Sequence, residues 1–243
     1  MATTHGGARF RHGPWRGSAT IAQVVPIGGG AVDREATEEI SSLVLGLGFH
    51  KILTAALGPG EQKPFLEFGY RIHEPLRLLE LNLDPDTIDR STRPTRRMRR
   101  RDVAASLAID TASFTSFWQF DADALGEALS ATPTSRRRVV RSGQVVLGYA
   151  VTGHANRTGF IQRLAVDPAN RRTGVGSSLL ADGLAWLQAR GARSVLVNTQ
   201  PENEAALALY DQFDFVERPG GLAVLCLEAS PPRLRSANNE ETT

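Results

Sequence analysis

The sequence of 243 residues contains a single cysteine, Cys226, so no disulfide bond can form within the chain. This scarcity is typical of proteins in a reducing compartment, and we expect a cytoplasmic protein. No uninterrupted apolar run reaches the roughly 18 residues of a membrane span, and residues 1–17 lack the apolar core of a signal peptide. The lack of cysteine pairs and of long apolar runs argues against a secreted domain held together by disulfide bonds, and no membrane partner is expected.

The sequence also lacks an excess of charge of either sign, because 28 Lys and Arg residues are balanced by 26 Asp and Glu residues, for a formal net charge of +2. A balance of this kind does not indicate a chain that binds polyanions over its whole surface. The one strongly basic stretch, residues 89–102, is interpreted as a solvated linker. Docking to nucleic acid, ribosome or an acidic membrane through Arg96 to Arg101 remains open as the alternative, and nucleic acid is not expected as a partner.

The most informative stretch joins a strand-like run, Phe160–Val166, to a helix pattern, residues 177–190, through a glycine-bearing loop, Arg171–Gly176. Such a loop leaves backbone N–H groups at a helix N-terminus, where they and the helix dipole suit a phosphate. Gly174 and Gly176 allow close approach of the anion because they have no Cβ. The loop has neither the ending of a P-loop nor the three glycines of a dinucleotide turn. Taken alone, it is equally typical of a plain strand-to-helix turn.

A second polar pair follows shortly afterwards. Residues 194–199 have the pattern of a buried strand, and Asn203 is placed to cap the next helix. Tyr210 lies seven residues after Asn203, so both side chains share one face of that helix. An amide and a phenol on one face, beside a phosphate cradle, form a specific arrangement.

These segments resemble the GNAT superfamily of acyl-CoA-dependent N-acyltransferases. The resemblance covers roughly residues 104–228 and departs from the family at Asp214, where a glycine is usual. Asp tolerates left-handed backbone, so the turn is expected to survive. The matching residues are Arg171, Gly174 and Gly176 of the loop motif, Leu164–Pro168 before it, and Asn203, Ala206, Leu209 and Tyr210 after it.

The resemblance implies an α/β fold, a mixed and mostly antiparallel twisted sheet flanked by helices on both faces. The parallel strands that carry Val166 and Val197 would splay and leave a cleft for acetyl-CoA as cosubstrate. Backbone groups of Leu164, Ala165 and Val166 would bind the pantetheine arm, and Asn203 would contact it. The implied pyrophosphate-binding residues are Arg171, Arg172, Thr173, Gly174, Val175, Gly176 and Ser177.

The resemblance also implies an enzyme that transfers an acetyl group from acetyl-CoA to an amine by direct attack in a ternary complex. Tyr210 would be the catalytic acid for the leaving thiolate, because a phenol with a pKa of about 10 stays protonated at neutral pH. The acceptor would be a protein N-terminus, a lysine or a small-molecule amine. A non-catalytic acyl-CoA sensor or scaffold remains the alternative, and a homodimer is compatible with either.

The acceptor side is less defined by the sequence. Residues 103–109 are expected to form a first strand, followed by aromatic residues among which Trp118 is the predicted acceptor-binding side chain. Gln162 is predicted to orient the acceptor or a water. No general base is assigned. The candidates by residue type are Asp110, Asp121, Asp123 and His154, and each is more typical of a surface or capping position.

An internal repeat appears when the chain is aligned with itself at an offset of about 145 residues, which places Phe65 on Tyr210. The earlier copy has no counterpart of Asn203 or of the loop motif, and we interpret it as a degenerate partial GNAT-like domain. The expected organisation is a flexible N-terminus at 1–17, the partial domain at 18–88, the Arg-rich linker at 89–102, an N-acetyltransferase domain at 103–229 and a disordered tail at 230–243.

Overall fold

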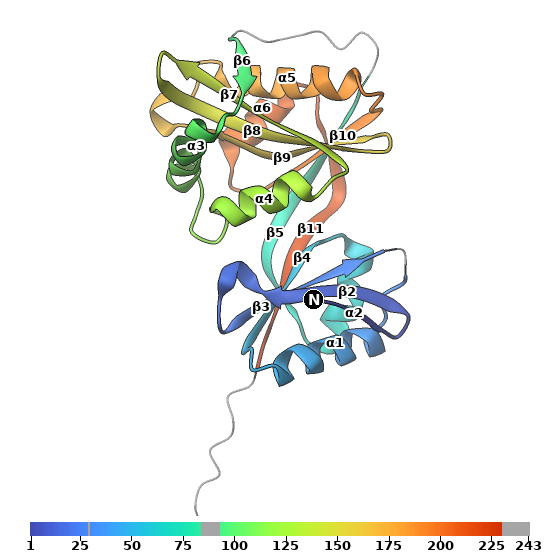
Figure 1. Cartoon of the computed structure of the whole chain (residues 1–243). Coiled ribbons are helices and arrows are strands. Elements are labelled where there is room, and N and C mark those ends of the chain that lie inside the picture. The colour runs from blue at the N-terminus through green and yellow to red at the C-terminus, as the bar shows by residue number, and fades with distance from the viewer. Residues whose placement is uncertain (29, 84–92, 230–243) are drawn as a thin grey trace, which may run out of the picture. The chain divides into compact units, whose positions relative to one another are not determined.

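The computed structural model describes residues 1–28, 30–83 and 93–229, and the chain divides into two compact units (Figure 1). Unit 1 consists of residues 1–74 and 223–243, and unit 2 of residues 75–222. Gly29, the expected tail at 230–243, and residues 84–92 of the expected half-copy and linker lie outside the described residues. Within the described ranges, none of the helices has the length and apolar content needed to span a bilayer.

Unit 1 is a sheet with two helices and a core of its own. Its strands, in spatial order, are β1 (Ala2–His5), β2 (Ala8–Pro14), β3 (Ile21–Ile27), β4 (Lys51–Leu57) and the end of β11 (Val216–Glu228); its helices are α1 (Arg34–Gly46), α2 (Pro59–Phe68) and the short 3-10 turn η1 (Trp15–Gly17). Strands β3 and β4 run parallel. Asp33 starts α1, because its carboxylate accepts a hydrogen bond from the Ala36 amide at 2.8 Å.

Unit 2 is a mixed sheet with helices on both faces. Its strands, in spatial order, are the start of β11, the end of β5 (Arg71–Asn82), β10 (Ser194–Thr199), β9 (Thr158–Val166), β8 (Val145–Ala155), β7 (Thr134–Ser142) and β6 (Thr95–Arg97). Its helices are α3 (Arg100–Ser113), α4 (Ala122–Ser130), α5 (Val175–Gln188), α6 (Glu204–Asp211) and the 3-10 turn η2 (Pro168–Asn170). The expected α/β fold is confirmed.

Strand β8 is buried on both faces, which explains its nearly continuous apolar sequence. Tyr149 and Val151 pack in the cluster that includes Ile109 of α3. Ala150 instead packs with Val175 and Leu179 of α5. Helices α3 and α5 therefore cover opposite faces of the sheet.

The parallel strands β9 and β10 separate after a short contact. Their register contains only three pairs, from Ser194–Thr158 to Leu196–Phe160, although β9 continues to Val166 and β10 to Thr199. The expected splay is confirmed. It leaves the last part of β9 without a strand neighbour on the β10 side, and this gap defines the candidate site.

The internal repeat is visible as two copies of a strand-helix-strand-helix-strand pattern, β3-α1-β4-α2-β5 and β9-α5-β10-α6-β11. The last strand of each copy leaves its own half. Strand β11 pairs antiparallel with β4 in unit 1, and β5 pairs antiparallel with β10 in unit 2. Each unit thus completes its sheet with a strand from the other copy.

The expectation of a flexible N-terminus at residues 1–17 is wrong. Residues 2–5 and 8–14 form an antiparallel hairpin, which continues into an antiparallel pair with β3. The physical reason lies in the alternation of β2, where Ala8 and Phe10 are at most 1% exposed while the intervening Arg9 faces solvent. The basic residues Arg9 and Arg11 lie on the exposed outer face of this strand.

The expected strand at residues 103–109 is also wrong, because this segment lies inside helix α3. Asp102 starts the helix by accepting the Arg99 amide at 2.8 Å, and alanine-rich helix formers follow. The described part of the expected linker is structured as well. It contains β6, and Met98 is only 1% exposed. The Asp102 carboxylate forms an ion pair with Arg141 at 2.6 Å.

The unit boundaries therefore differ from those expected at residues 88 and 103. They fall within two strands, between Glu74 and Pro75 of β5 and between Leu222 and Ala223 of β11. A division read along the sequence assigns the last strand of each copy to its own half. The pairing of β5 with β10 and of β11 with β4 explains why that assignment fails.

We expect Phe10→Ala to lower the free energy of unfolding by about 3–5 kcal/mol, because a fully buried aromatic ring leaves a cavity in unit 1. Ile72→Ala is the matched control, since Ile72 is 58% exposed on β5 and its truncation should change stability by about 0.5 kcal/mol or less. Denaturant unfolding of the three proteins measures both changes. Equal stability of Phe10→Ala and the wild type would mean that the N-terminal hairpin is not part of the core.

Candidate active site

A cavity with a volume of about 420 Å³ lies in unit 2. It occupies the gap between β9 and β10, with the first turn of α5 at one end and the segment after α3 at the other. Most residues predicted to form the site line it. These are Trp118, Gln162, Leu164, Ala165, Val166, Arg171, Arg172, Gly174, Gly176, Ser177, Asn203 and Tyr210.

The loop before α5 forms an anion cradle. Arg172 and Gly174 adopt left-handed backbone with φ of 61° and 84°, and Gly174 is the N-cap of α5. A Cβ at Gly176 would lie 3.3 Å from the Leu209 side chain, so glycine keeps this entrance open. The free amides of the first helical turn suit a negatively charged group.

Two predicted cradle residues do not line the cavity with their side chains. Val175 is 1% exposed and packs in the core beneath α5. The Thr173 hydroxyl donates to the Asn170 carbonyl oxygen at 2.8 Å. The side chains of both residues therefore shape the turn, which leaves only their backbone amides available for a ligand.

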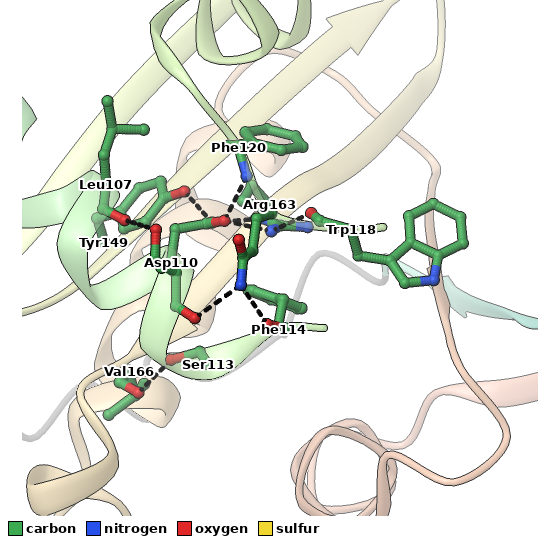
Figure 2. Close-up of polar contacts among 11 residues, drawn as sticks. Leu107, Asp110, Ser113, Phe114, Trp118, Phe120, Tyr149, Arg163 and Val166 are labelled. Carbon is green, nitrogen blue, oxygen red and sulfur yellow. Dashed lines mark hydrogen bonds and ion pairs between the residues drawn. The ribbon is translucent and has the colours of Figure 1, made fainter. Parts of the chain in front are cut away.

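The open edge of β9 forms one wall of the cavity. Residues Leu164, Ala165 and Val166 pair with β8 on one side, and β10 has left their other side. An extended ligand can therefore add hydrogen bonds to β9 as an extra strand would. Ser113 closes the end of this edge, where its hydroxyl donates to the Val166 carbonyl oxygen at 3.1 Å (Figure 2).

Helix α6 brings Asn203 and Tyr210 to the same wall. Asn203 caps the helix by accepting the Ala206 amide at 3.2 Å, and its Nδ2 donates to Thr199 Oγ1 at 3.0 Å. Both polar atoms of the Asn203 side chain therefore already make hydrogen bonds at the start of α6, and its contact with a ligand stays a prediction. The helix ends in a turn at Asp214, whose φ of 62° confirms the expected left-handed residue.

Tyr210 is 5% exposed and lines the cavity. Within the described part of the chain the Tyr210 hydroxyl makes no hydrogen bond. It is also not one of the fully buried polar atoms without a partner, so the hydroxyl is exposed to the cavity. Burial raises the pKa of Tyr210, and the positive charge of Arg163 partly opposes this rise. The phenol therefore stays protonated at neutral pH and can donate its proton.

A buried ion pair, which sequence reasoning missed, stands at the opposite end of the cavity. The Asp110 carboxylate accepts hydrogen bonds from Arg163 Nε at 2.7 Å and Nη2 at 2.6 Å, from the Phe120 amide at 2.6 Å, and from the Tyr149 hydroxyl (Figure 2). Arg163 Nη2 also donates to the Trp118 carbonyl oxygen at 2.7 Å. Together these bonds fasten the segment after α3 to β9. The only sequence signal is a charged residue at an inward position of a buried strand.

None of the four candidate bases reaches the cavity. Asp110 is committed to Arg163, and Asp121 caps α4 through the Ala124 amide at 2.7 Å. Asp123 is exposed in the first turn of α4. His154 is absent from the cavity wall, and its Nε2 is buried without a partner among the described residues.

Gln162 forms a bulge in β9, because Val151 and Thr152 of β8 pair with Arg163 and Ile161 and leave Gln162 unpaired. A Cβ at Gly153 would lie 2.7 Å from the Gln162 amide group, so this side chain lies directly on the β8 backbone. Its Oε1 has no hydrogen-bond partner among the described residues. Gln162 and Trp118 both line the acceptor end, and their acceptor roles stay predictions.

Comparison with known proteins identifies the fold of this unit. The family model described as Acetyltransferase (GNAT) family matches residues 104–215. A mycothiol acetyltransferase from Saccharopolyspora erythraea is 34% identical over 77 residues, which are 31% of this chain and 25% of that protein. One from Amycolatopsis mediterranei is 37% identical over 59 residues, 24% of this chain and 20% of that protein. The chain thus spans a quarter or less of the curated relatives it matches.

Solved structures share the fold over almost the whole chain. A tandem GNAT protein from the clavulanic acid biosynthesis pathway has a TM-score of 0.66 at 13% identity, covering 93% of this chain and 81% of its own. A GCN5-related N-acetyltransferase from Kribbella flavida has a TM-score of 0.63 at 14% identity, covering 96% and 91%. The coverage includes unit 1, in agreement with the expected N-terminal partial repeat.

The three tyrosines of the chain, Tyr70, Tyr149 and Tyr210, are at most 5% exposed, and burial raises the pKa of each. We expect no tyrosinate absorbance as the pH rises through about 10, where unfolded tyrosine ionises. Above that pH the folded chain keeps protons that the unfolded chain loses, so the free energy of unfolding falls as pH rises.

A spectrophotometric titration with parallel circular dichroism tests this expectation, and the same titration in guanidinium chloride is the control. All three phenols should ionise together with alkaline unfolding. Ionisation of a tyrosine near its ordinary pKa in the intact fold would contradict the burial described above.

Proposed function

Because residues 104–215 belong to the acetyltransferase (GNAT) family, we propose that this chain transfers an acetyl group from acetyl-CoA to an amine. One observation carries the proposal. A single cavity joins the α5 cradle, the open edge of β9 and the accessible hydroxyl of Tyr210. The names of the relatives support acetyl transfer, but their acceptor is not carried over, since the match covers less than a third of this chain.

The chain's own groups fit acetyl-CoA. The first-turn amides of α5, with Arg171 and Arg172 at the rim, would bind the pyrophosphate. The edge of β9 from Leu164 to Val166 would bind the amide groups of the pantetheine arm, beside Asn203. This placement directs the thioester end of the substrate toward Tyr210 and the β9 bulge.

The reaction forms a nitrogen–carbon bond and a sulfur–hydrogen bond, breaks a carbon–sulfur bond, and releases one proton of the amine to water. The amine nitrogen attacks the thioester carbonyl carbon, and the carbon–sulfur bond breaks as the thiolate leaves. Tyr210 donates its proton to that sulfur, which its raised pKa permits because the phenol is fully protonated at neutral pH. Direct attack is favoured, since the described cavity wall holds no cysteine and no histidine that could activate a serine.

We propose that only unit 2 binds acetyl-CoA. Phe65, fully buried in α2, stands where α6 has Tyr210, so unit 1 has no phenol at the corresponding position. The helix of unit 1 that corresponds to α5 is α1, and its N-cap is Asp33, whose carboxylate accepts the Ala36 amide at 2.8 Å. A carboxylate at that helix N-terminus opposes an anion. Unit 1 then has a structural role through the strands it exchanges with unit 2.

Calorimetric titration of acetyl-CoA should show binding near one equivalent. A double substitution, Gly174→Glu with Gly176→Glu, should weaken binding by at least about 100-fold, because two carboxylates then occupy the cradle. The matched control is Gly191→Glu with Gly126→Glu. Gly191 has φ of 76°, Gly126 lies in α4, and a Cβ at either position meets open space. Failure of the wild type to bind acetyl-CoA would refute the proposed function.

Tyr210→Phe should lower kcat by about 10²–10⁴-fold, because the thiolate then leaves without a positioned acid. Its dissociation constant for acetyl-CoA should change little, since the ring remains. Tyr70→Phe in unit 1 is the control. The Tyr70 hydroxyl bonds Ser41 at 2.9 Å, and neither residue lines the cavity. Acetyl transfer is followed by release of free thiol, and an unchanged kcat in Tyr210→Phe would remove Tyr210 from its role.

A further inference from the structure

The described wall of the cavity contains no aspartate, no glutamate and no histidine. Its ionisable side chains are Tyr210 and three arginines, Arg163, Arg171 and Arg172. The Asp110 carboxylate, which is bonded to Arg163, Tyr149 and the Phe120 amide, has no exposure. No side chain of this wall is therefore suited to remove a proton from an ammonium group.

The absence of an anion affects which amines can react. An ammonium ion has no lone pair, and Arg163 at the acceptor end favours the neutral form of an approaching amine. An amine with a low pKa reaches the site neutral without help. The α-amine of a peptide has a pKa of about 7.8, whereas that of a lysine side chain is about 10.4. Their neutral fractions at pH 7 differ by about 340-fold.

Arg163 also has an unused donor edge. Its Nε and Nη2 bond Asp110, and Nη2 bonds the Trp118 carbonyl oxygen. The rings of Phe114 and Phe120 lie 3.5 and 4.0 Å from the guanidinium carbon and hold it in place.

The remaining nitrogen of Arg163, Nη1, has no hydrogen-bond partner within the described ranges. Nη1 is not one of the fully buried polar atoms without a partner, and Arg163 lines the cavity, so Nη1 is exposed to it. Nη1 can therefore donate to an oxygen atom of a bound acceptor.

We propose that the acceptor is the α-amine of an aminoacyl group, whose neighbouring carbonyl oxygen is bound by Arg163 Nη1. This inference rests on the proposed function and narrows its acceptor. The carbonyl lowers the pKa of the amine beside it, so one group supplies both features that the cavity selects. After attack, the second proton of the amine passes to water, and Tyr210, having protonated the thiolate, is reprotonated by solvent.

The direct test uses one peptide with a free N-terminal alanine and an internal lysine, acetylated by the wild-type protein and acetyl-CoA at pH 7. Mass spectrometry of fragments shows which amine carries the acetyl group. The α-amine should be acetylated at least tenfold faster, because the difference in neutral fraction is only partly offset by its lower nucleophilicity. Alaninamide in a parallel reaction distinguishes a small aminoacyl amide from a longer peptide as the preferred source.

The pH dependence provides a second readout. With alaninamide, kcat/KM should rise tenfold per pH unit and level off near the pKa of the acceptor, and this plateau should move when the acceptor is changed. A plateau that stays at one pH for acceptors of different basicity would reveal an enzymic base and overturn the inference. Faster acetylation of the lysine would overturn it as well.

The role of Arg163 is tested with a double substitution, Asp110→Asn with Arg163→Met, which removes both buried charges together. The two acceptors compared are alaninamide and 2,2-difluoroethylamine, a weakly basic amine without a carbonyl group. The ratio of their kcat/KM values should fall at least tenfold in the variant, mainly through the KM for alaninamide. An unchanged ratio would exclude Arg163 as the carbonyl-binding residue.

Failure of the inference and failure of the proposed function give different results. Binding of acetyl-CoA with no acetylation of the α-amine overturns the inferred acceptor class and leaves cofactor binding intact. Absence of acetyl-CoA binding instead overturns the proposed function. Calorimetry with acetyl-CoA also reports whether the double variant retains its fold, and the peptide competition requires no variant.

Discussion

The separation of β9 from β10 is the constraint on which the candidate site depends. Two parallel strands normally hydrogen-bond along their length, yet here the register ends at the pair Leu196–Phe160. The bulge at Gln162 follows two residues later and turns β9 away from the regular ladder. The free edge of β9, the cavity beside it and the access of Tyr210 to that cavity all follow from this separation.

The buried pair of Asp110 and Arg163 links this geometry to the other end of the site. Burying two charges is unfavourable unless nearly all their hydrogen bonds are made, and Asp110 accepts four. The pair ties α3, β8 and the segment that carries Trp118 to the strand with the bulge. It therefore fixes the acceptor wall relative to the open edge, while the spare donor of Arg163 remains available.

The cofactor side of the site could be predicted from the sequence because its geometry is local. The φ of Gly174, the cap at Asn203 and the turn at Asp214 depend on neighbouring residues, so short motifs indicate them. Arg163 could not be found this way, since its partner Asp110 lies 53 residues away. The apolar positions of residues 103–109 suit a strand as well as a helix, so the sequence pattern does not distinguish the two. The cap at Asp102 favours the helix that forms.

The exchanged strands explain why the earlier half-copy matters to the candidate site. In unit 2, β5 pairs with the whole of β10 from Ser194 to Thr199, along the edge of β10 that faces away from β9. Strand β5 belongs in sequence to the earlier copy, and its last residue, Asn82, precedes the first cavity-lining residue, Ser113, by 31 positions. Without it, β10 would be an unsupported strand beside a gap, and both edges of the separation would lose their fixed geometry. Unit 2 thus depends on the partial copy for the strand that supports β10 beside the cavity.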